Sequence, residues 1–198
     1  MAEETQILRK AADYTEDNIR HLDDMEHVRT RAGMYIGRLG DGAHAEDGIY
    51  VLLKETIDNS IDEFNEGFGK RIEVSIEDGL RATVRDYGRG IPPGKLVDVV
   101  SQLNTGGKFD NDNYTASVGL NGVGLKAVNA LSSKFTARTH REGKYREVVF
   151  ERGKIVSDKK GKTEEEDGTF IAFTPDDTLF LHYRFRDEFV SNMLRNYT

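Results

Sequence analysis

Apolar side chains recur every three or four positions between residues 46 and 66, and no other stretch of the sequence constrains the fold as strongly. A repeat of this period places an apolar stripe along a helix, so we predict a long helix over 46–66 with one buried face. Gly67 and Gly69 follow the stripe and are expected to end the helix. The stripe consists of Ile49, Leu53, Ile57, Ile61 and Phe64.

The rest of the chain predicts a sheet on which helices can pack. Asp78-Gly79 and Glu142-Gly143 each separate two strand-like runs, as turn residues do between paired strands. We expect strands at 71–77, 81–86, 134–141, 144–152 and 169–174, and further helices at 23–31 (closed by Gly33), 95–103, 124–131 and 183–196. Residues 159–167 are expected to form a solvated loop, and the Gly-, Asn- and Asp-rich residues 104–124 a functional or mobile one. The predicted fold class is α+β: a two-layer α/β sandwich with a mixed, mostly antiparallel sheet and helices on one face.

Composition narrows the class of protein. A length of 198 residues suits one domain, and we divide the chain into a polar N-terminal arm (1–17) and a domain (18–198). The absence of cysteine excludes disulfides and thiolate metal sites. No apolar run approaches the roughly 20 residues that span a bilayer, so we expect no membrane partner and a cytoplasmic location. A net charge of −7 makes the domain a poor grip on DNA phosphates by itself. The five histidines do not cluster at metal-ligand spacing, and each is interpreted as a surface or hydrogen-bonded residue.

Four oxygen-bearing side chains form a second stripe on the helix over 46–66. Glu55, Asp58, Asn59 and Asp62 fall at i, i+3, i+4 and i+7 and are therefore expected to share one face. One interpretation is a solvated surface. The other is a site for a hard cation such as Mg²⁺, which prefers oxygen ligands, together with a carboxylate that acts as a base toward water.

Two glycine-containing segments suggest a ligand pocket. Asp86 ends a strand before Gly88 and Gly90, where the backbone can approach a flat ligand and the carboxylate can accept from an amino group. Residues 119–124 have the spacing G-x-x-G-x-G before a helix and can present backbone N–H groups to phosphate, with Lys108 in the same stretch. The glycine loop matches neither a dinucleotide fingerprint nor a P-loop. An ordinary turn and a flexible glycine loop remain the alternatives.

The order of these motifs resembles one family. ExxDN, DxGxGIP, GGKF with GLxGVG, and a downstream GT follow one another as in the GHKL ATPases, which include topoisomerase subunits, mismatch-repair proteins, chaperones and histidine kinases. HVRTRAGMYIG, KETIDNSIDE and GGKFDNDNY are similar to the B subunits of bacterial type II DNA topoisomerases. YTEDNIRHLDDMEHV looks more like the topoisomerase IV type than gyrase. The resemblance runs from about Tyr14 to the C-terminus.

The resemblance implies a site for ATP and Mg²⁺, with roles carried over by position. Glu55 corresponds to the general base, Asn59 to the single protein ligand of Mg²⁺, and Asp86 to the reader of the adenine amine. Thr169 assists Asp86 through a water, and Gly90, Ile91 and Pro92 line the adenine pocket. The phosphates are held by Lys108 and by the backbone of Leu120, Asn121, Gly122, Val123 and Gly124. Tyr114 contacts the nucleotide, Tyr14 reaches the nucleotide of the partner subunit, and Arg89 and Arg141 lie where coumarin-type inhibitors bind.

The implied function is ATP-driven gating in a type II topoisomerase. Nucleotide binding dimerises two B subunits, which close a clamp around DNA and act together with the A subunit. The chain ends at Thr198, before the transducer and DNA-cleavage domains of that family, so we expect a monomer that binds ATP and hydrolyses it slowly. The alternatives are another GHKL ATPase or a non-catalytic nucleotide-sensing module for dimerisation. Ala32, Tyr87, Val118 and Asn121 depart from the usual pattern without removing a group that has a direct chemical role.

Overall fold

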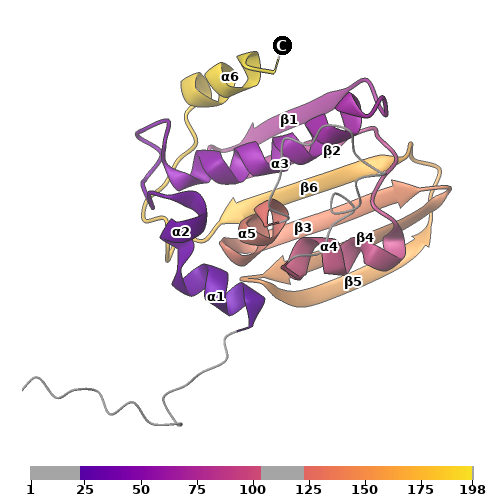
Figure 1. Ribbon diagram of the computed structural model, residues 1–198, viewed down its shortest axis with the longest axis horizontal. Coiled ribbons are helices and arrows are strands. Elements are labelled where there is room, and N and C mark those ends of the chain that lie inside the picture. The colour runs from indigo at the N-terminus through magenta and orange to yellow at the C-terminus, as the bar shows by residue number, and fades with distance from the viewer. Residues whose placement is uncertain (1–22, 104–122, 198) are drawn as a thin grey trace, which may run out of the picture.

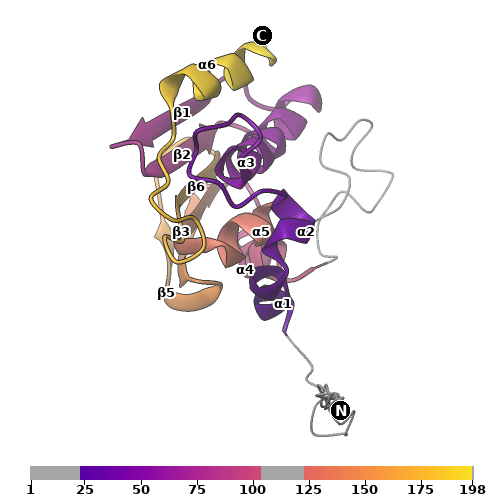
Figure 2. The same cartoon turned by 90° about the vertical axis from the view of Figure 1, so that its left-hand side faces the viewer.

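The computed structural model describes residues 23–103 and 123–197, which form a two-layer sandwich (Figure 1). A six-stranded sheet is one layer, and helices cover one of its faces (Figure 2). The strands are β1 (Ile72–Glu77), β2 (Arg81–Asp86), β3 (Ser132–Arg141), β4 (Lys144–Glu151), β5 (Lys154–Lys162) and β6 (Gly168–Pro175). The helices are α1 (Asp24–Thr30), α2 (Ala32–Ile36), α3 (Gly48–Asn65), the 3-10 turn η2 (Pro93–Lys95), α4 (Leu96–Ser101), α5 (Gly124–Ala130) and α6 (Asp187–Arg195). The predicted α+β sandwich is confirmed.

The sheet has the strand order β1-β2-β6-β3-β4-β5, and every neighbouring pair is antiparallel. The expected parallel component is therefore missing from the described strands. Tight turns explain three of the pairings, because Asp78, Glu142 and Arg152 each have a positive φ and each is followed by a glycine with positive φ. Such turns match the twist of antiparallel strands. The late strand β6 then inserts between β2 and β3, antiparallel to both.

The long helix α3 packs on β2 and β6 of the sheet and contributes to the core. Ile49, Leu53 and Ile57 are buried as the periodicity predicts. Phe64 is 51% exposed, since it lies in the last turn of the helix. The apolar stripe of α3 therefore includes one residue, Phe64, that the fold does not bury.

The strand β5 replaces part of the loop that was expected over residues 159–167. It pairs along its length with β4 and is almost wholly exposed at the edge of the sheet. An edge strand with polar side chains on both faces has no alternating apolar pattern, so its sequence resembles a loop. Backbone hydrogen bonding to β4 and the turn at Arg152-Gly153 determine this strand instead.

Other boundaries shift for local reasons. Gly33 lies inside the short helix α2 and does not end α1. The helix expected over 95–103 is shorter and begins with the turn η2 at Pro93. Before α6 the chain is extended, because the N–H groups of Arg184 and Phe185 donate to the carbonyls of Asp41 and Gly79. Within the described ranges, no helix combines the length and apolarity needed to cross a bilayer.

Candidate functional site

On the helix-covered face of the sheet, the apolar core and a polar site lie in adjacent cross-strand rows. Val84, Ile171, Ala137 and Val148 form a cross-strand row of β2, β6, β3 and β4, and all four are buried. Two residues further along each strand, the same face carries Asp86, Thr169, Thr139, Arg146 and Lys160. Side chains two apart on a strand face the same way. The core therefore ends in a row of polar groups, called here the polar row.

Asp86 is the acid of this row, and it is buried at 2% exposure. Its Oδ1 accepts the backbone N–H groups of Gly88 and Thr169, both at 3.0 Å. Its Oδ2 accepts the hydroxyl of Ser60 on α3 at 3.2 Å. A carboxylate has about four acceptor positions, so Oδ2 keeps capacity for a further donor.

The pKa of Asp86 is raised because burial disfavours its charge. The N–H groups of Gly88 and Thr169, the hydroxyl of Ser60 and the nearby Arg85 all act in the opposite direction. A buried carboxylate held by aligned donors is the arrangement that selects a ligand by hydrogen bonding. This residue is where the sequence predicts a reader of an amino group.

The turn after Asp86 presses against β3. Gly90 has a φ of 71°, and a Cβ there would lie 2.4 Å from the carbonyl oxygen of His140, so a side chain does not fit. Side chains of the sheet donate to three carbonyls of this turn: Thr139 Oγ1 to Ile91 at 2.7 Å, Arg141 Nη1 to Gly90 at 3.2 Å and Arg146 Nη1 to Pro93 at 2.7 Å. The wall formed by residues 90–92 is thereby fixed to the sheet.

Glu55 of α3 lies against Gly124, the first residue of α5. A Cβ at Gly124 would lie 2.1 Å from Oε2 of Glu55, so the absence of a side chain makes room for the carboxylate. Glu55 and Gly124 are both partly exposed, as is the preceding Val123. The candidate base and the end of the glycine motif therefore meet at an accessible place.

The expected stripe of four oxygen-bearing groups is divided in the structure. Asp58 and Asp62 are 3% and 0% exposed, whereas Glu55 and Asn59 remain accessible. Asp58 accepts from Nζ of Lys54 at 2.5 Å and from the hydroxyl of Tyr197. The four groups lie on one helix at the expected spacing but in different surroundings, because the C-terminal segment packs against Asp58.

The described residues contain no group of three or more histidines or carboxylates arranged to hold a metal ion. Asn59 lies one turn after Glu55 on α3, and its amide oxygen is a hard donor of the kind that Mg²⁺ accepts. A single protein ligand is what this donor set can offer. It suits an ion that keeps waters and phosphate oxygens as its other ligands.

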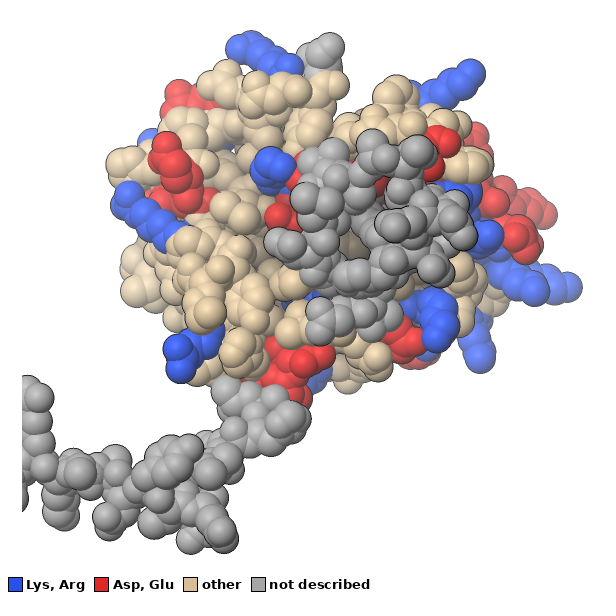
Figure 3. Space-filling view, in the orientation of Figure 1, with Lys and Arg blue, Asp and Glu red and all other residues tan. Residues whose placement is uncertain are grey.

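The two arginines beside this turn, Arg89 and Arg141, belong to different segments and are held by different layers. Arg89 forms a bidentate pair with Glu63 of α3, with Nη2–Oε1 at 2.9 Å and Nε–Oε2 at 3.1 Å. Its guanidinium lies 4.0 Å from the ring centroid of Phe68. Arg141 belongs to β3 and reaches the turn from the sheet. On this helix-covered face of the molecule, acidic and basic side chains are interspersed (Figure 3).

Several predicted site residues lie outside the described residues: Tyr14, Lys108, Tyr114, Leu120, Asn121 and Gly122. The predicted residues that can be placed fall into two groups. Asp86, Thr169 and the turn 89–92 meet at the ends of β2, β6 and β3. Glu55 and Gly124 meet between α3 and α5. Ser60 connects the two layers, since it follows Asn59 on α3 and bonds Asp86.

Sequence reasoning missed Ser60, Thr139 and His140. The signal for Ser60 was available, because it follows Asn59 on the same helix, whereas Thr139 depends on sheet register. His140 is 2% exposed, its Nδ1 has no hydrogen-bond partner among the described residues, and burial lowers its pKa. The interpretation of every histidine as exposed or fully hydrogen-bonded is therefore wrong for His140.

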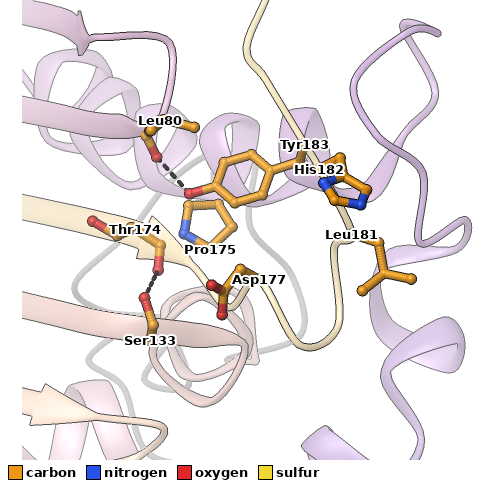
Figure 4. A pocket seen from close by; sticks show the side chains of 8 residues that line it. All are labelled: Leu80, Ser133, Thr174, Pro175, Asp177, Leu181, His182 and Tyr183. Atoms are coloured by element: carbon orange, nitrogen blue, oxygen red, sulfur yellow. Dashed lines mark hydrogen bonds between the residues drawn. The ribbon is translucent and has the colours of Figure 1, made fainter.

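A separate cavity of about 350 Å³ opens at the other end of β6 (Figure 4). Its lining includes Leu80, Leu181 and His182, and Tyr183 donates its hydroxyl to the carbonyl of Leu80 at 2.8 Å. β6 begins at Gly168 beside Asp86 and ends at Pro175 in this cavity. The length of a strand separates the two places, so the cavity is no part of the candidate site.

Comparison with known families interprets this geometry. Residues 44–179 match the family described as histidine kinase-, DNA gyrase B- and HSP90-like ATPase. The chain belongs to this ATPase family. The matched range includes Glu55, Asn59, Asp86 and Thr169, which are the residues that the motifs singled out.

Members of this ATPase family with similar sequences are topoisomerase subunits. The chain is 50% identical to the B subunit of DNA topoisomerase 4 from Borreliella burgdorferi over 95% of its own length and 31% of that protein. It is 40% identical to the B subunit of DNA gyrase from Mycoplasma genitalium, with 84% and 27% covered. The resemblance to B subunits is thus confirmed, although the chain spans less than a third of these relatives.

A solved structure agrees with the fold. The 43K ATPase domain of Thermus thermophilus gyrase B, in complex with an aminocoumarin, superposes with a TM-score of 0.73 at 30% identity. The match covers 89% of this chain and 45% of that one. The two-layer sandwich is therefore the fold of the gyrase B ATPase domain.

Proposed function

We propose that this chain binds and hydrolyses ATP as the N-terminal domain of a type II DNA topoisomerase B subunit, of the topoisomerase IV kind. The observation that supports it most is the buried carboxylate of Asp86, held by Ser60, Gly88 and Thr169 at the end of an apolar sheet. A carboxylate in this setting accepts a hydrogen bond from an amino group and rejects a carbonyl oxygen. Adenine presents an amino group where guanine presents a carbonyl.

Adenine recognition would be divided between two walls. Asp86 accepts the exocyclic amine, and Thr169, whose N–H already bonds Asp86, adds its hydroxyl through a water. Gly90, Ile91 and Pro92 form the flat wall against which the base lies. The hydrogen bond from Thr139 to the Ile91 carbonyl keeps this wall in place.

Hydrolysis would depend on the helix α3. Glu55 orients and deprotonates the attacking water, and its accessible carboxylate next to Gly124 supports that role. Asn59 supplies the one protein ligand for Mg²⁺, and the ion when bound neutralises charge on the phosphates. Both residues lie on one rigid helix, so their spacing is fixed.

The remaining roles follow from the resemblance alone. Lys108 and the backbone of Leu120, Asn121, Gly122, Val123 and Gly124 would hold the phosphates, and Tyr114 would contact the nucleotide. Tyr14 would reach the nucleotide of a second copy when two B subunits close a clamp on DNA, together with the A subunit. Arg89 and Arg141, on either side of the turn 90–92, would contact inhibitors of the aminocoumarin class.

Calorimetric titration with a non-hydrolysable ATP analogue, with and without Mg²⁺, tests the proposal. We expect binding that Mg²⁺ strengthens. Glu55→Ala should keep this binding and lose hydrolysis, because the base acts only in the chemical step. If Glu55→Ala hydrolysed ATP as fast as the unmodified chain, a nucleotide-sensing module would be the better description.

A further inference from the structure

At its far end, the polar row adjoins a basic surface. Arg141, Lys144, Lys160 and Lys162 lie at the ends of β3, β4 and β5, and we call them the strand-end patch. Lys144 is the ladder partner of both Arg141 and Lys162. Partners in a ladder project to the same face, and Arg141 reaches the carbonyl of Gly90 on that face. The patch therefore faces the same side as the candidate site, at the strand ends that lie on the right in Figure 1.

The three lysines of the patch are exposed and available. In the two described ranges, Lys144, Lys160 and Lys162 form no ion pair. Of the nearby acids, Glu142 pairs with Arg141 of the patch at 3.3 Å. Asp158 pairs with Arg146 at 2.7 Å, and Glu165 lies 3.4 Å from His140, so neither pairs with a lysine of the patch. His140 alternates with Thr139 and Arg141, so this contact lies on the opposite face of the sheet.

The arrangement of these lysines is unfavourable for the isolated domain. Lys144 lies directly opposite Lys162, and neither lysine has an acidic partner in the described ranges. Like charges in such positions repel each other and weaken the ladder. The chain as a whole has a net charge of −7, so this basic surface is not a consequence of general composition. An external anion would relieve the repulsion.

We propose that the strand-end patch binds the phosphate backbone of duplex DNA. Neighbouring strands lie about 4.8 Å apart and alternate residues about 6.7 Å apart. Arg141, Lys144 and Lys162 therefore form a row about 10 Å long, and Lys160 lies about 6.7 Å from Lys162 along β5. Duplex DNA carries a charge every ~1.7 Å of its axis, so several phosphates come within reach. The inference rests on the proposed function, in which the parent enzyme handles DNA.

Salt dependence of binding gives a direct test. Fluorescence anisotropy of a labelled duplex would be measured with the 198-residue chain, its Lys160→Ala/Lys162→Ala variant and the control Lys134→Ala/Lys154→Ala. The control lysines are exposed and lie at the opposite ends of β3 and β5. Each phosphate contact contributes a slope of about −0.9 to log K against log salt.

We expect the slope of log K against log salt to be less steep by about 1.8 for the Lys160→Ala/Lys162→Ala variant than for the unmodified chain. The ratio of the two affinities should therefore decrease about 12-fold between ~50 and ~200 mM salt. The control should behave as the unmodified chain. Equal slopes for the patch variant and the unmodified chain would overturn the proposal, and so would tighter binding of polyglutamate than of duplex, which would indicate an acidic protein partner. Absence of salt-dependent duplex binding by the unmodified chain would also overturn it.

Two further measurements distinguish DNA binding by the patch from a structural role of its lysines and from a failure of the proposed function. The melting temperature of the patch variant should be equal or higher, because a repulsion is removed; a lower value would mean that the lysines are structural. Binding of the ATP analogue should be unchanged. If the unmodified chain failed to bind the analogue, the proposed function would fail instead, whatever the result with DNA.

Discussion

Replacing Asp86 by Asn tests the recognition of the adenine amine without removing the side chain. In the unmodified chain, Oδ1 accepts two backbone N–H groups and Oδ2 accepts the hydroxyl of Ser60. An asparagine can keep its oxygen toward Gly88 and Thr169, since both are donors. Its NH₂ then replaces Oδ2, and the Ser60 hydroxyl can rotate to accept from it. We therefore expect the variant to fold.

The cost falls on the ligand. The exocyclic amine of adenine would meet an NH₂ group, so a hydrogen bond to a charged acceptor is lost and two donors face each other. Such a bond is worth about 1.5–3 kcal/mol, which corresponds to an affinity loss of about 10- to 150-fold. The same NH₂ can donate to the carbonyl oxygen of guanine, so the preference for the ATP analogue over its GTP counterpart should narrow by more than the loss for ATP alone.

The pH dependence provides a second readout. Burial raises the pKa of Asp86, so its charged form is lost at a higher pH than for a surface aspartate. Affinity for the ATP analogue should decrease as the pH falls through this raised value, and the Asn variant should not show the decrease. The effect of Asp86 on folding stability has the opposite dependence on pH. As the pH rises from the pKa of Asp86 in the unfolded chain to its higher pKa in the folded chain, the free energy of unfolding decreases, because the folded chain must then bury a charge.

Calorimetry with ATP and GTP analogues across this pH range would measure the loss of affinity, the change in base preference and the pH dependence of binding. The melting temperatures of the variant and the unmodified chain would be compared to confirm that both are folded. An Asp86→Asn variant that binds the ATP analogue within about threefold of the unmodified chain, a difference of about 0.6 kcal/mol, would refute this role of Asp86. An unchanged pH profile would show that another group titrates.

Three further predictions concern single contacts. Gly124→Ala should fold, because the worst clash of the added Cβ is with the flexible carboxylate of Glu55, whose Oε2 would lie 2.1 Å away. Displacing that carboxylate by about 1 Å should slow steady-state hydrolysis about 100-fold with binding retained. Unchanged turnover would contradict the role of Glu55. Ser60→Ala removes a hydrogen bond that lowers the pKa of Asp86, so the loss of analogue binding in acid should move to higher pH, and an unmoved profile would contradict it. Asp176→Ala leaves Arg29 and Arg152 without their buried acceptor and should lower the free energy of unfolding, measured in urea, by about 3 kcal/mol. Burial opposes the charge of Asp176, but hydrogen bonds from Arg152, Thr178 and Arg29 outweigh burial and hold its pKa below the usual range. The stability difference between the unmodified chain and the variant should therefore persist from neutral pH to below pH ~4 and close only in stronger acid.

Local periodicity was enough to predict the framework of the fold. The stripe on α3 and the turns at Asp78-Gly79 and Glu142-Gly143 are short-range signals, and each lies where the sequence indicates. β5 was missed because its pairing with β4 is made by backbone groups, which leave no apolar pattern. The insertion of β6 between β2 and β3 is a long-range pairing that no local pattern encodes.

The sequence predicts those parts of the candidate site whose functional residues are close together in the chain. Asp86 and the turn 88–92 follow one another in the chain, so their proximity is evident from sequence. The helix geometry that placed Asp58 beside Glu55 was correct in spacing, but the approach of Tyr197 from the other end of the chain could not be read from it. Thr139 was invisible for the same reason, since only the register between β3 and β6 brings it to the turn.

The step from Val84 to Asp86 along β2 makes strand register a condition for ligand binding. A slip of one residue would turn Val84 outward, place Arg85 among the apolar side chains and carry the carboxylate to the solvent side. Core and pocket would be lost together, so a misregistered chain could retain strands yet never bind the base. Nucleotide affinity is therefore a stricter measure of correct folding for this domain than its content of secondary structure.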